Sequence, residues 1–248
     1  MSDELPVLWQ YSFSNYNEKA RWALDFKGIR HRRKSLFPAG RRALAFSRHG
    51  TLPVLDLDGK RIVDSTHIIE ALEERQPKPA LYPADPADCS RALELEDFFD
   101  EHAGHDVRRV GFWDARERPD WVVTFMCTDQ PAALRLVLRA MLPRVRSVMR
   151  RRFAITEEEV ERSREVLRAA LDRIEGERQG GDYLVGESFT VADLTAAALL
   201  YPIAWPPEFP YSLPERFPSP FLDSIADHPA VGWITEIWHR HRGASAAA

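Results

Sequence analysis

The chain of 248 residues has only two cysteines, Cys89 and Cys127, and they form no Cys-x-x-Cys pair. A mechanism that cycles between a dithiol and a disulfide is therefore excluded, because it needs two thiols at close spacing. Two cysteines without a pairing pattern are also typical of a reducing compartment, so we expect a cytoplasmic protein.

Long apolar runs are absent as well. The longest covers residues 196–205 and is interrupted by Pro202, whereas a membrane-spanning helix needs about 20 apolar residues. The segment Ser2-Asp3-Glu4 lacks the basic and then apolar regions of a signal peptide. We therefore expect neither a membrane segment nor a secretion signal.

The sequence also lacks metal-ligand spacing, a glycine-rich phosphate loop and internal repeats, so we expect no metal site. Seven arginines do gather between residues 135 and 152, which could indicate nucleic-acid binding. Residues 83–248 nevertheless carry an excess of negative charge, and such a run is more often a solvated face paired with glutamates. We expect no nucleic-acid partner.

What the sequence does contain is a proline at the start of a buried strand, in Gly50-Thr51-Leu52-Pro53-Val54-Leu55. Proline lacks an N–H and is tolerated only at the first residue or the edge of a strand. A cis bond between Leu52 and Pro53 would also expose the backbone of Leu52 to a ligand. The next segment predicts a hairpin with an Asp58-Gly59 turn, followed by a helix that Asp64-Ser65 opens.

The start of that helix has free N–H groups and a positive dipole end, which attract a carboxylate. Leu52, Pro53, Asp64 and Ser65 therefore predict a binding site for one small zwitterionic molecule. Residues 1–82 have an excess of basic side chains, and His49 stands just before the proline turn. Both features suit an anionic ligand.

Periodicity predicts a β-α-β-α-β-β-α unit in residues 1–78. Strands are expected near residues 7–9, 31–36, 54–57 and 62–63. Helices are expected up to residues 27–28, over about 41–48, and from 65 to 76. The order of these elements and motifs resembles the glutathione-binding half of the cytosolic glutathione S-transferases. The resemblance implies a thioredoxin-like domain, with glutathione as co-substrate. Leu52 would meet its cysteinyl backbone, and Asp64-Ser65 would hold its γ-glutamyl end.

In this family a Ser, Tyr or Cys after the first strand donates a hydrogen bond to the glutathione sulfur and favours the thiolate, which is the nucleophile. The run Lys19-Ala20-Arg21 resembles the zeta-like class, also known as maleylacetoacetate isomerases, and places Ser14 on its first active-site serine. The family's Ser-Ser-Cys is Ser14-Asn15-Tyr16 here, so the cysteine is missing. Ser14 could instead be only a helix N-cap. Tyr11 is the next candidate, followed by Asn15 and Tyr16.

Beyond a proline-stiffened linker at residues 76–83, residues 88–248 predict an all-helical domain. Helices are expected over about 89–106, 130–152 (bent or broken at Pro143), 157–178 and 221–241. Thr190 and Asp193 predict a capping box, in the Gly-x-x-Phe-Thr-x-Ala-Asp arrangement that glutathione transferases also carry. The expected fold class is α/β plus all-α, a thioredoxin-like domain followed by a helical one.

Residues 202–220 form a proline-rich stretch interleaved with aromatic side chains. This loop is either a lid or wall of a second-substrate pocket, or an ordered surface loop that fills a gap over the helices.

Two hypotheses for the function follow. In the first, the thiolate of glutathione attacks a small apolar electrophile, as in a detoxifying glutathione transferase. In the second, the chain is a catalytically weak or inactive glutathione-transferase-like binding or interaction protein. The resemblance also implies a homodimer, with the adjacent Phe98 and Phe99 as candidate contacts.

Overall fold

The computed structural model describes residues 4–36 and 51–248. The helix expected over residues 41–48 and the candidate ligand residue His49 lie outside these ranges. Within them, no helix combines the length and the apolar character needed to cross a membrane.

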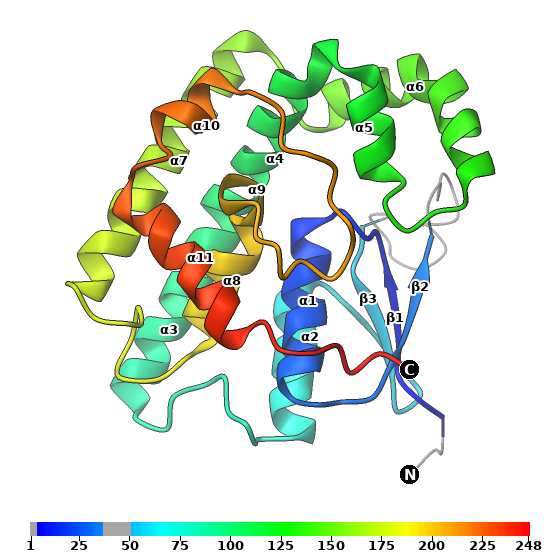
Figure 1. The fold of residues 1–248 in the computed structure, drawn as a ribbon. Helices are drawn as coiled ribbons and strands as arrows, with labels where there is room; N and C mark the ends of the chain where they lie inside the picture. Colours follow the sequence, from blue (N-terminus) through cyan, green and yellow to red (C-terminus); the bar gives the residue numbers. More distant parts are fainter. Residues whose placement is uncertain (1–3, 37–50) are drawn as a thin grey trace.

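The first domain is built on a small mixed sheet (Figure 1). Its described strands are β1 (Val7–Gln10), β2 (Arg32–Ser35), β3 (Val54–Leu57) and β4 (Lys60–Val63), in the order β2-β1-β3-β4. Strand β1 runs parallel to β2 and antiparallel to β3. The helices α1 (Asn15–Phe26) and α2 (Ser65–Arg75) pack side by side next to the sheet. This is the thioredoxin-like arrangement that the sequence predicts.

The hairpin between β3 and β4 turns at Asp58 and Gly59, which have φ values of +49° and +79°. Positive φ at both central residues matches the twist of the flanking strands, and an Asp-Gly pair tolerates it well. The predicted hairpin turn is confirmed. It brings the chain back along β4 directly to the start of α2.

The second domain is helical, and every described element beyond residue 85 is a helix. In chain order these elements are α3 (Pro86–Phe98), the π-helix η2 (Phe99–Ala103), α4 (Gly104–Asp114), the short η3 (Ala115–Glu117), α5 (Pro119–Met126), α6 (Ala132–Arg152), α7 (Glu157–Arg178), α8 (Val191–Leu199), α9 (Tyr201–Ala204), α10 (Pro220–Ser224) and α11 (Pro229–His241).

Two expected helix boundaries are wrong, each because of a proline. The first helix of the second domain, α3, starts earlier than the expected residue 89, since Asp85 caps it and Pro86 occupies its first position. Helix α6 continues across the exposed Pro143, so of the two expectations for this helix, a bend or a break, the break does not occur. The expected helix over 221–241 is two helices, because Pro229 begins a new one that His228 caps through the Ala230 N–H.

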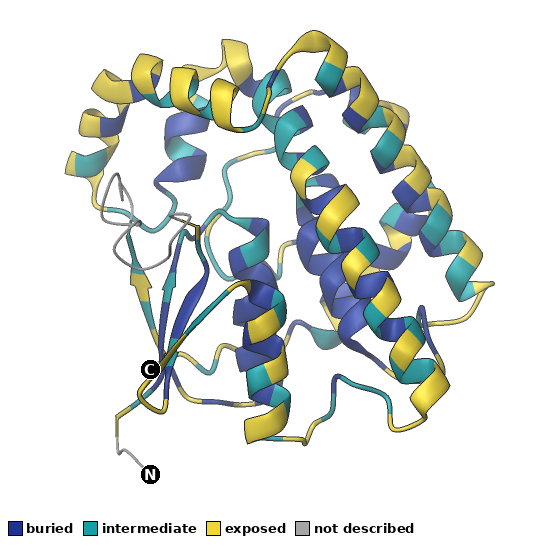
Figure 2. Cartoon of the chain, turned by 180° about the vertical axis from the view of Figure 1, so that it is seen from behind, coloured by how far each residue is buried: buried dark blue, intermediate teal, exposed yellow. Residues whose placement is uncertain are grey.

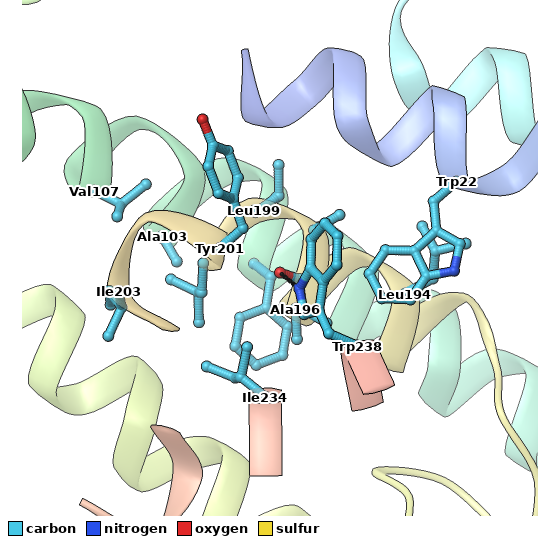
Figure 3. Close-up of a cluster of buried hydrophobic side chains, with 14 of the residues drawn as sticks. Trp22, Ala103, Val107, Leu194, Ala196, Leu199, Tyr201, Ile203, Ile234 and Trp238 are labelled. Carbon is cyan, nitrogen blue, oxygen red and sulfur yellow. Dashed lines mark hydrogen bonds between the residues drawn. The ribbon is translucent and has the colours of Figure 1, made fainter. Parts of the chain in front are cut away.

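The core is organised around α8, whose residues are all buried. The predicted capping box is confirmed: Thr190 accepts a hydrogen bond from the Ala192 N–H, and Asp193 accepts one from the Thr190 N–H. Figure 3 shows Trp22 of α1 and Trp238 of α11 meeting over this helix, with ring centroids 4.6 Å apart. The buried indole N–H of Trp238 is satisfied by Ala197 O at 3.0 Å. Both domains therefore share one continuous core.

Residues 242–248 form a tail that returns to the first domain (red in Figure 1). The Arg242 Nε lies 2.6 Å from Glu18 Oε1 on α1. Farther along, the Ala246 N–H donates to Asp25 and the Ala248 N–H donates to His31 O, at 2.8 and 2.9 Å. The tail therefore connects the last helix to the first helix and to the edge of the sheet.

Candidate functional site

One cavity of about 910 Å³ is lined by residues of both domains, including the N-terminal ends of α1 and α2. The structure brings together on its wall every predicted site residue that lies in the described ranges: Tyr11, Ser14, Leu52, Pro53, Asp64 and Ser65.

The bond between Leu52 and Pro53 is cis. Pro53 is buried directly before β3, where its missing N–H removes no bond from the strand ladder. The carbonyl of Leu52 accepts a hydrogen bond from Asn17 Nδ2 at 3.1 Å. The backbone of Leu52 is thus held against the start of α1, on the wall of the cavity.

Asp64 and Ser65 take different roles at the start of α2. Asp64 is the N-cap, and its carboxylate accepts the Thr66 N–H at 2.9 Å. Ser65 is only 1% exposed, and its Oγ has no hydrogen-bond partner among the described residues. An unsatisfied buried hydroxyl costs about 1–3 kcal/mol. A hydroxyl left open at a helix N-terminus, on the wall of a cavity, suits a ligand carboxylate.

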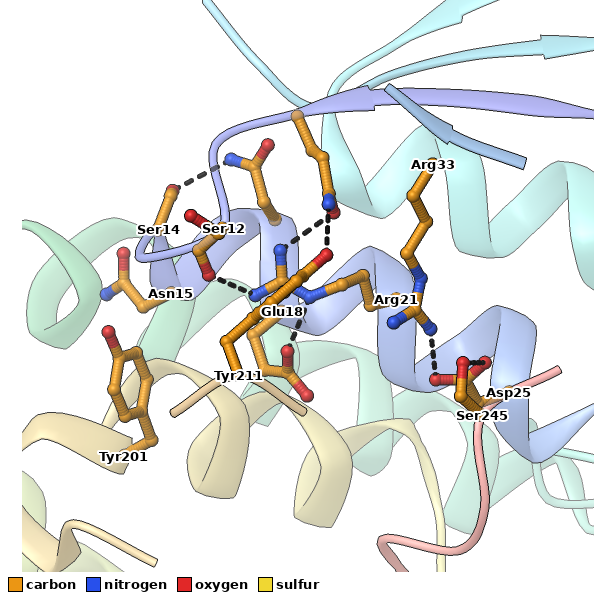
Figure 4. Close-up of polar contacts among 12 residues, drawn as sticks. Ser12, Ser14, Asn15, Glu18, Arg21, Asp25, Arg33, Tyr201, Tyr211 and Ser245 are labelled. Atoms are coloured by element: carbon orange, nitrogen blue, oxygen red, sulfur yellow. Dashed lines mark hydrogen bonds and ion pairs between the residues drawn. The ribbon is translucent and has the colours of Figure 1, made fainter. Parts of the chain in front are cut away.

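Ser14 occupies the N-cap position of α1 but makes no capping hydrogen bond. Its Oγ instead accepts a hydrogen bond from Asn17 Nδ2 at 2.8 Å (Figure 4). Within residues 4–36 and 51–248 no acceptor is found for the Ser14 O–H. The hydroxyl can therefore donate to a group in the cavity, and capping does not explain this serine.

Asn17 is a site residue that the sequence analysis missed. It is fully buried, and its side chain contacts three parts of the site. Its Nδ2 donates to Ser14 Oγ and Leu52 O, and its Oδ1 accepts the Tyr11 N–H at 2.9 Å. A polar side chain three residues after Ser14, on the inward face of a helix, was the signal that could have revealed it.

Two of the alternative hydrogen-bond donors to the glutathione sulfur already donate to backbone carbonyls of the protein. The Asn15 side chain donates to Gly104 O and Leu199 O, at 3.0 and 3.1 Å, and so ties α1 to the helical domain. The Tyr16 hydroxyl donates to Asp100 O at 2.6 Å. Burial and the nearby Asp100 carboxylate raise the pKa of Tyr16 far above its usual range. Neither side chain has a hydrogen to spare for a thiolate in this geometry.

Tyr11 remains an alternative to Ser14. Its ring stacks on Phe13 with centroids 5.7 Å apart, and it lines the same cavity. Burial raises the pKa of the Tyr11 phenol, so the proton stays on the oxygen and can be donated.

Lys19 and Arg21, on which the resemblance to the zeta-like class rests, lie outside the cavity lining and contact the residues around it. Lys19 Nζ pairs with Glu96 and Asp100 of the helical domain, at 2.8 and 2.7 Å. The Arg21 guanidinium donates to Ser12 O at 2.8 Å and pairs with Glu18 at 2.6 Å (Figure 4). Arg21 therefore fixes the loop before Ser14, Lys19 ties α1 to the helical domain, and neither side chain lines the cavity.

The proline-rich loop after α9 contributes Trp205, Arg216 and Phe217 to the wall of the cavity. Its backbone is anchored there, because the indole N–H of Trp121 donates to Glu215 O at 2.8 Å and that of Trp205 donates to Pro214 O. Of the two interpretations of this loop, the contacts support a pocket wall.

The remaining wall is largely apolar and comes from α4, α5 and α6. Helix α6 contacts little besides α5 and carries exposed apolar residues (yellow positions of the upper helix at left in Figure 2). The apolar side chains that line this side include Phe112, Trp121, Phe125, Val137, Met141, Val148 and Phe153. The cavity therefore has a polar side on the first domain and an apolar side on the second. No group of three metal-ligating side chains occurs in the described part of the chain.

The sequence matches the glutathione S-transferase N-terminal domain over residues 8–80. It matches the glutathione S-transferase C-terminal domain over residues 122–219. The chain belongs to the glutathione S-transferase family. Its class within that family is not fixed by these two matches.

Relatives agree with this membership. A maleylacetoacetate isomerase from Rhizobium meliloti (strain 1021) is 37% identical over 94 residues. That match covers 36% of this chain and 44% of the relative, so it spans less than half of either.

Solved structures share the fold across nearly the whole chain. The β-etherase LigF from Sphingobium sp. strain SYK-6 superposes with a TM-score of 0.71 at 19% identity, covering 96% of this chain and 97% of its own. A glutathione S-transferase from Methylobacterium radiotolerans, in complex with glutathione sulfonate, superposes with a TM-score of 0.64 at 22% identity, covering 96% and 92%.

Proposed function

We propose that the chain is a glutathione transferase: glutathione binds on the polar side of the cavity, and its thiolate attacks an electrophile held on the apolar side. The observation that carries the proposal is the pair of hydroxyls at Ser14 and Ser65. Both face one cavity, and neither donates to a described residue. Open donors beside a helix N-terminus suit an anionic, sulfur-bearing ligand.

The roles of the side chains follow from their positions. The γ-glutamyl carboxylate would accept from Ser65 Oγ and the first N–H groups of α2, and Asp64 would face the α-ammonium group. The cysteinyl backbone would lie along Leu52, which places the sulfur near Ser14 at the start of α1. His49 stays a prediction as a further glutathione contact.

In this arrangement Ser14 acts as a hydrogen-bond donor to the sulfur. A thiol with an ordinary pKa near 8.5 is mostly protonated at pH 7, and a donor together with a helix N-terminus favours the thiolate. The thiolate forms a bond to the electrophilic carbon, and the leaving group departs with its electron pair. Asn17 would orient Ser14 through its bond to the serine oxygen.

The isomerase activity in the name of the Rhizobium relative is not part of this proposal. The family's Ser-Ser-Cys is Ser14-Asn15-Tyr16 here, and Asn15 and Tyr16 hold the two domains together. The alternative, a binding or interaction protein that keeps the scaffold without turnover, retains the same glutathione site.

Several further expectations belong to the same proposal. We infer a glutathione-binding domain over residues 1–78 and a helical domain over 88–248, in a cytoplasmic homodimer. Phe99 is buried in the monomer, and Phe98 packs on Phe99, His102 and Arg173. The adjacent phenylalanines are thus accommodated without a partner, and the dimer rests on the family resemblance.

The test measures binding and turnover separately. Thermal unfolding is followed with and without millimolar glutathione, which stabilises by about 2.7 kcal/mol at a hundredfold excess over Kd. Conjugation of 1-chloro-2,4-dinitrobenzene is then followed by absorbance. A shift together with conjugation supports the transferase. A shift without conjugation of any aryl halide favours the binding protein, and no shift means that the assigned site is wrong.

A further inference from the structure

The helical side of the cavity carries arginines that lack counter-ions. Arg108, Arg144 and Arg216 line it, and none of them forms an ion pair with a carboxylate of the described residues. Their neighbour Arg109 shows the ordinary arrangement, since it pairs with Asp106 and donates to Phe153 O. The cavity wall opposite the glutathione site is therefore apolar and positively charged.

Arg108 on α4 is the most deeply placed of the three. Its guanidinium carbon lies 4.9 Å from the ring centres of both Tyr16 and Phe153. Its Nε is buried without a hydrogen-bond partner among the described residues, and one terminal nitrogen contacts His105 Nδ1. A desolvated cation without a counter-charge is costly, and such a group is stabilised when an anion binds beside it.

The acidic side chains near Arg108 pair with other groups and do not supply its counter-charge. Asp100 is engaged by Lys19, and Asp106 by Arg109 and Ser163. Burial and the Arg108 charge lower the pKa of His105, so the imidazole stays neutral and does not compete for an anion. Burial also lowers the pKa of Arg108, but an arginine remains charged at neutral pH.

The side chains around Arg108 indicate the shape and polarity of the ligand as well as its charge. Phe153, under the guanidinium, stacks on Phe112, and both rings line the cavity together with the apolar side chains of α6. The ring of Tyr16, two residues after Ser14, also lies 4.9 Å from the Arg108 guanidinium carbon. A ligand that reaches Arg108 therefore lies on aromatic rings, with its charged end at α4 on the helical side of the cavity.

We propose that the second substrate is an apolar electrophile that carries a carboxylate, and that Arg108 binds this carboxylate. This inference rests on the proposed transferase function. It restricts the electrophiles of that function to those with an acidic group. A guanidinium matches a planar carboxylate with two parallel hydrogen bonds, whereas an ester offers no charge to pair.

The experiment compares two probes, 4-chloro-3,5-dinitrobenzoate and its methyl ester, of which only the first is charged. With either, the glutathione thiolate bonds to the ring carbon that bears chlorine, and chloride leaves with the bonding electron pair. The thiol proton goes to solvent and the acid group is unchanged. Each kcat/KM is divided by the uncatalysed rate constant with glutathione, which removes the difference in intrinsic reactivity.

For the wild type we expect the corrected kcat/KM to favour the acid by about tenfold or more, the size of one charge-assisted hydrogen bond. Arg108→Gln should bring the ratio to near one while leaving the ester rate within about threefold. Arg108→Lys should keep part of the preference, because it retains charge without the planar fork. Arg150→Gln, an exposed arginine of α6 outside the cavity lining, is the matched control and should keep the wild-type ratio.

A binding measurement separates this inference from the function on which it rests. Calorimetry follows the unreactive 3,5-dinitrobenzoate in the presence of S-methylglutathione. Binding to the wild type that Arg108→Gln abolishes supports the acid site even if no electrophile is turned over. Equal wild-type rates for acid and ester, or an equal loss of both in Arg108→Gln, overturn the inference and leave the transferase function standing. Weaker binding of glutathione alone to Arg108→Gln would assign the guanidinium to glutathione and also overturn it.

Discussion

The polar groups at the start of α1 and those farther along the helix differ in whether they have partners within the described residues. At its start, Ser14 has an O–H that no described residue accepts, and Ser65 at the adjacent start of α2 has an unpartnered oxygen. Farther along the helix, Glu18 pairs with Arg21 at 2.6 Å and Asp25 pairs with Arg33 at 2.5 Å (Figure 4). Glu18 also pairs with Arg242, at 2.6 Å.

This difference in pairing distinguishes the polar residues that stabilise the fold from those proposed to bind a ligand, within one helix. Both regions are buried and polar, so composition alone does not distinguish them. The middle of α1 forms a closed network in which each charge faces an opposite one, as a buried ionic cluster requires. The start of α1 is open toward a cavity, and an open buried donor is stable only when water or a ligand completes it.

The largest effect should come from breaking the closed network. Glu18→Gln removes the negative charge shared by Arg21 and Arg242, and we expect the free energy of unfolding to fall by about 3–5 kcal/mol. Urea denaturation followed by circular dichroism measures it. Glu161→Gln is the control, since its pair with Arg164 is exposed and should contribute less than about 1 kcal/mol. Equal losses in the two variants would contradict the distinction.

The second effect concerns catalysis. Ser14→Ala should lower the kcat for conjugation by a factor on the order of 10² at most, since one donor to a forming anion is lost. The free energy of unfolding should fall by about 1–3 kcal/mol at most, because Ser14 makes no capping bond and only the Asn17 Nδ2 donor loses its partner. Tyr11→Phe is the parallel variant. If it abolishes activity while Ser14→Ala retains it, the two residues exchange roles.

The third effect concerns glutathione affinity. Ser65→Ala should weaken binding at least about tenfold, because a hydrogen bond to a carboxylate contributes about 1.5–3 kcal/mol. Without ligand the variant should be as stable as the wild type or slightly more so, since an unsatisfied buried oxygen is removed. Thermal shifts measure both quantities.

Ser163→Ala is the matched control for Ser65→Ala. Ser163 is also buried, but its hydroxyl contacts Asp106, Glu159 O and Arg109. This variant should lose stability and keep its glutathione affinity. Loss of apo stability in Ser65→Ala would show that the open oxygen has a structural partner after all.

The smallest effect concerns pH and the far end of the first domain. Burial and the nearby Arg33 lower the pKa of His31, whose ring donates to Ile29 O and accepts from Arg33 Nε. An unfolded histidine has a pKa near 6.5. Below that value the unfolded state binds more protons, so stability falls as the pH drops. The melting temperature of His31→Gln should decrease less than that of the wild type between pH 7.5 and 5.5. Parallel curves would exclude this histidine as a cause.

Much of the fold was predictable because its signals are local. Alternation and turn residues gave the strands and the Asp58-Gly59 hairpin, and the capping box at Thr190 is contained in four residues. The turns that bring Leu52-Pro53 and Asp64-Ser65 to the cavity wall were also predictable, since they depend on the local backbone.

The features that escaped prediction depend on distant partners. Asn17 contacts Leu52, and Arg108 lies on Tyr16 across the domain boundary, contacts that no local pattern encodes. That Ser65 Oγ has no hydrogen-bond partner in residues 4–36 and 51–248 likewise depends on the assembled fold and not on a local pattern.

The tail over residues 242–248 has a consequence for how the molecule unfolds. It ties α11 to α1 through Arg242 and to the edge of the sheet through Ala248, so the last segment of the chain is bound to the first domain. Opening either domain therefore also releases contacts of the other. Separate melting of the two halves is disfavoured, and we expect one cooperative transition in calorimetry, with equal van't Hoff and calorimetric enthalpies.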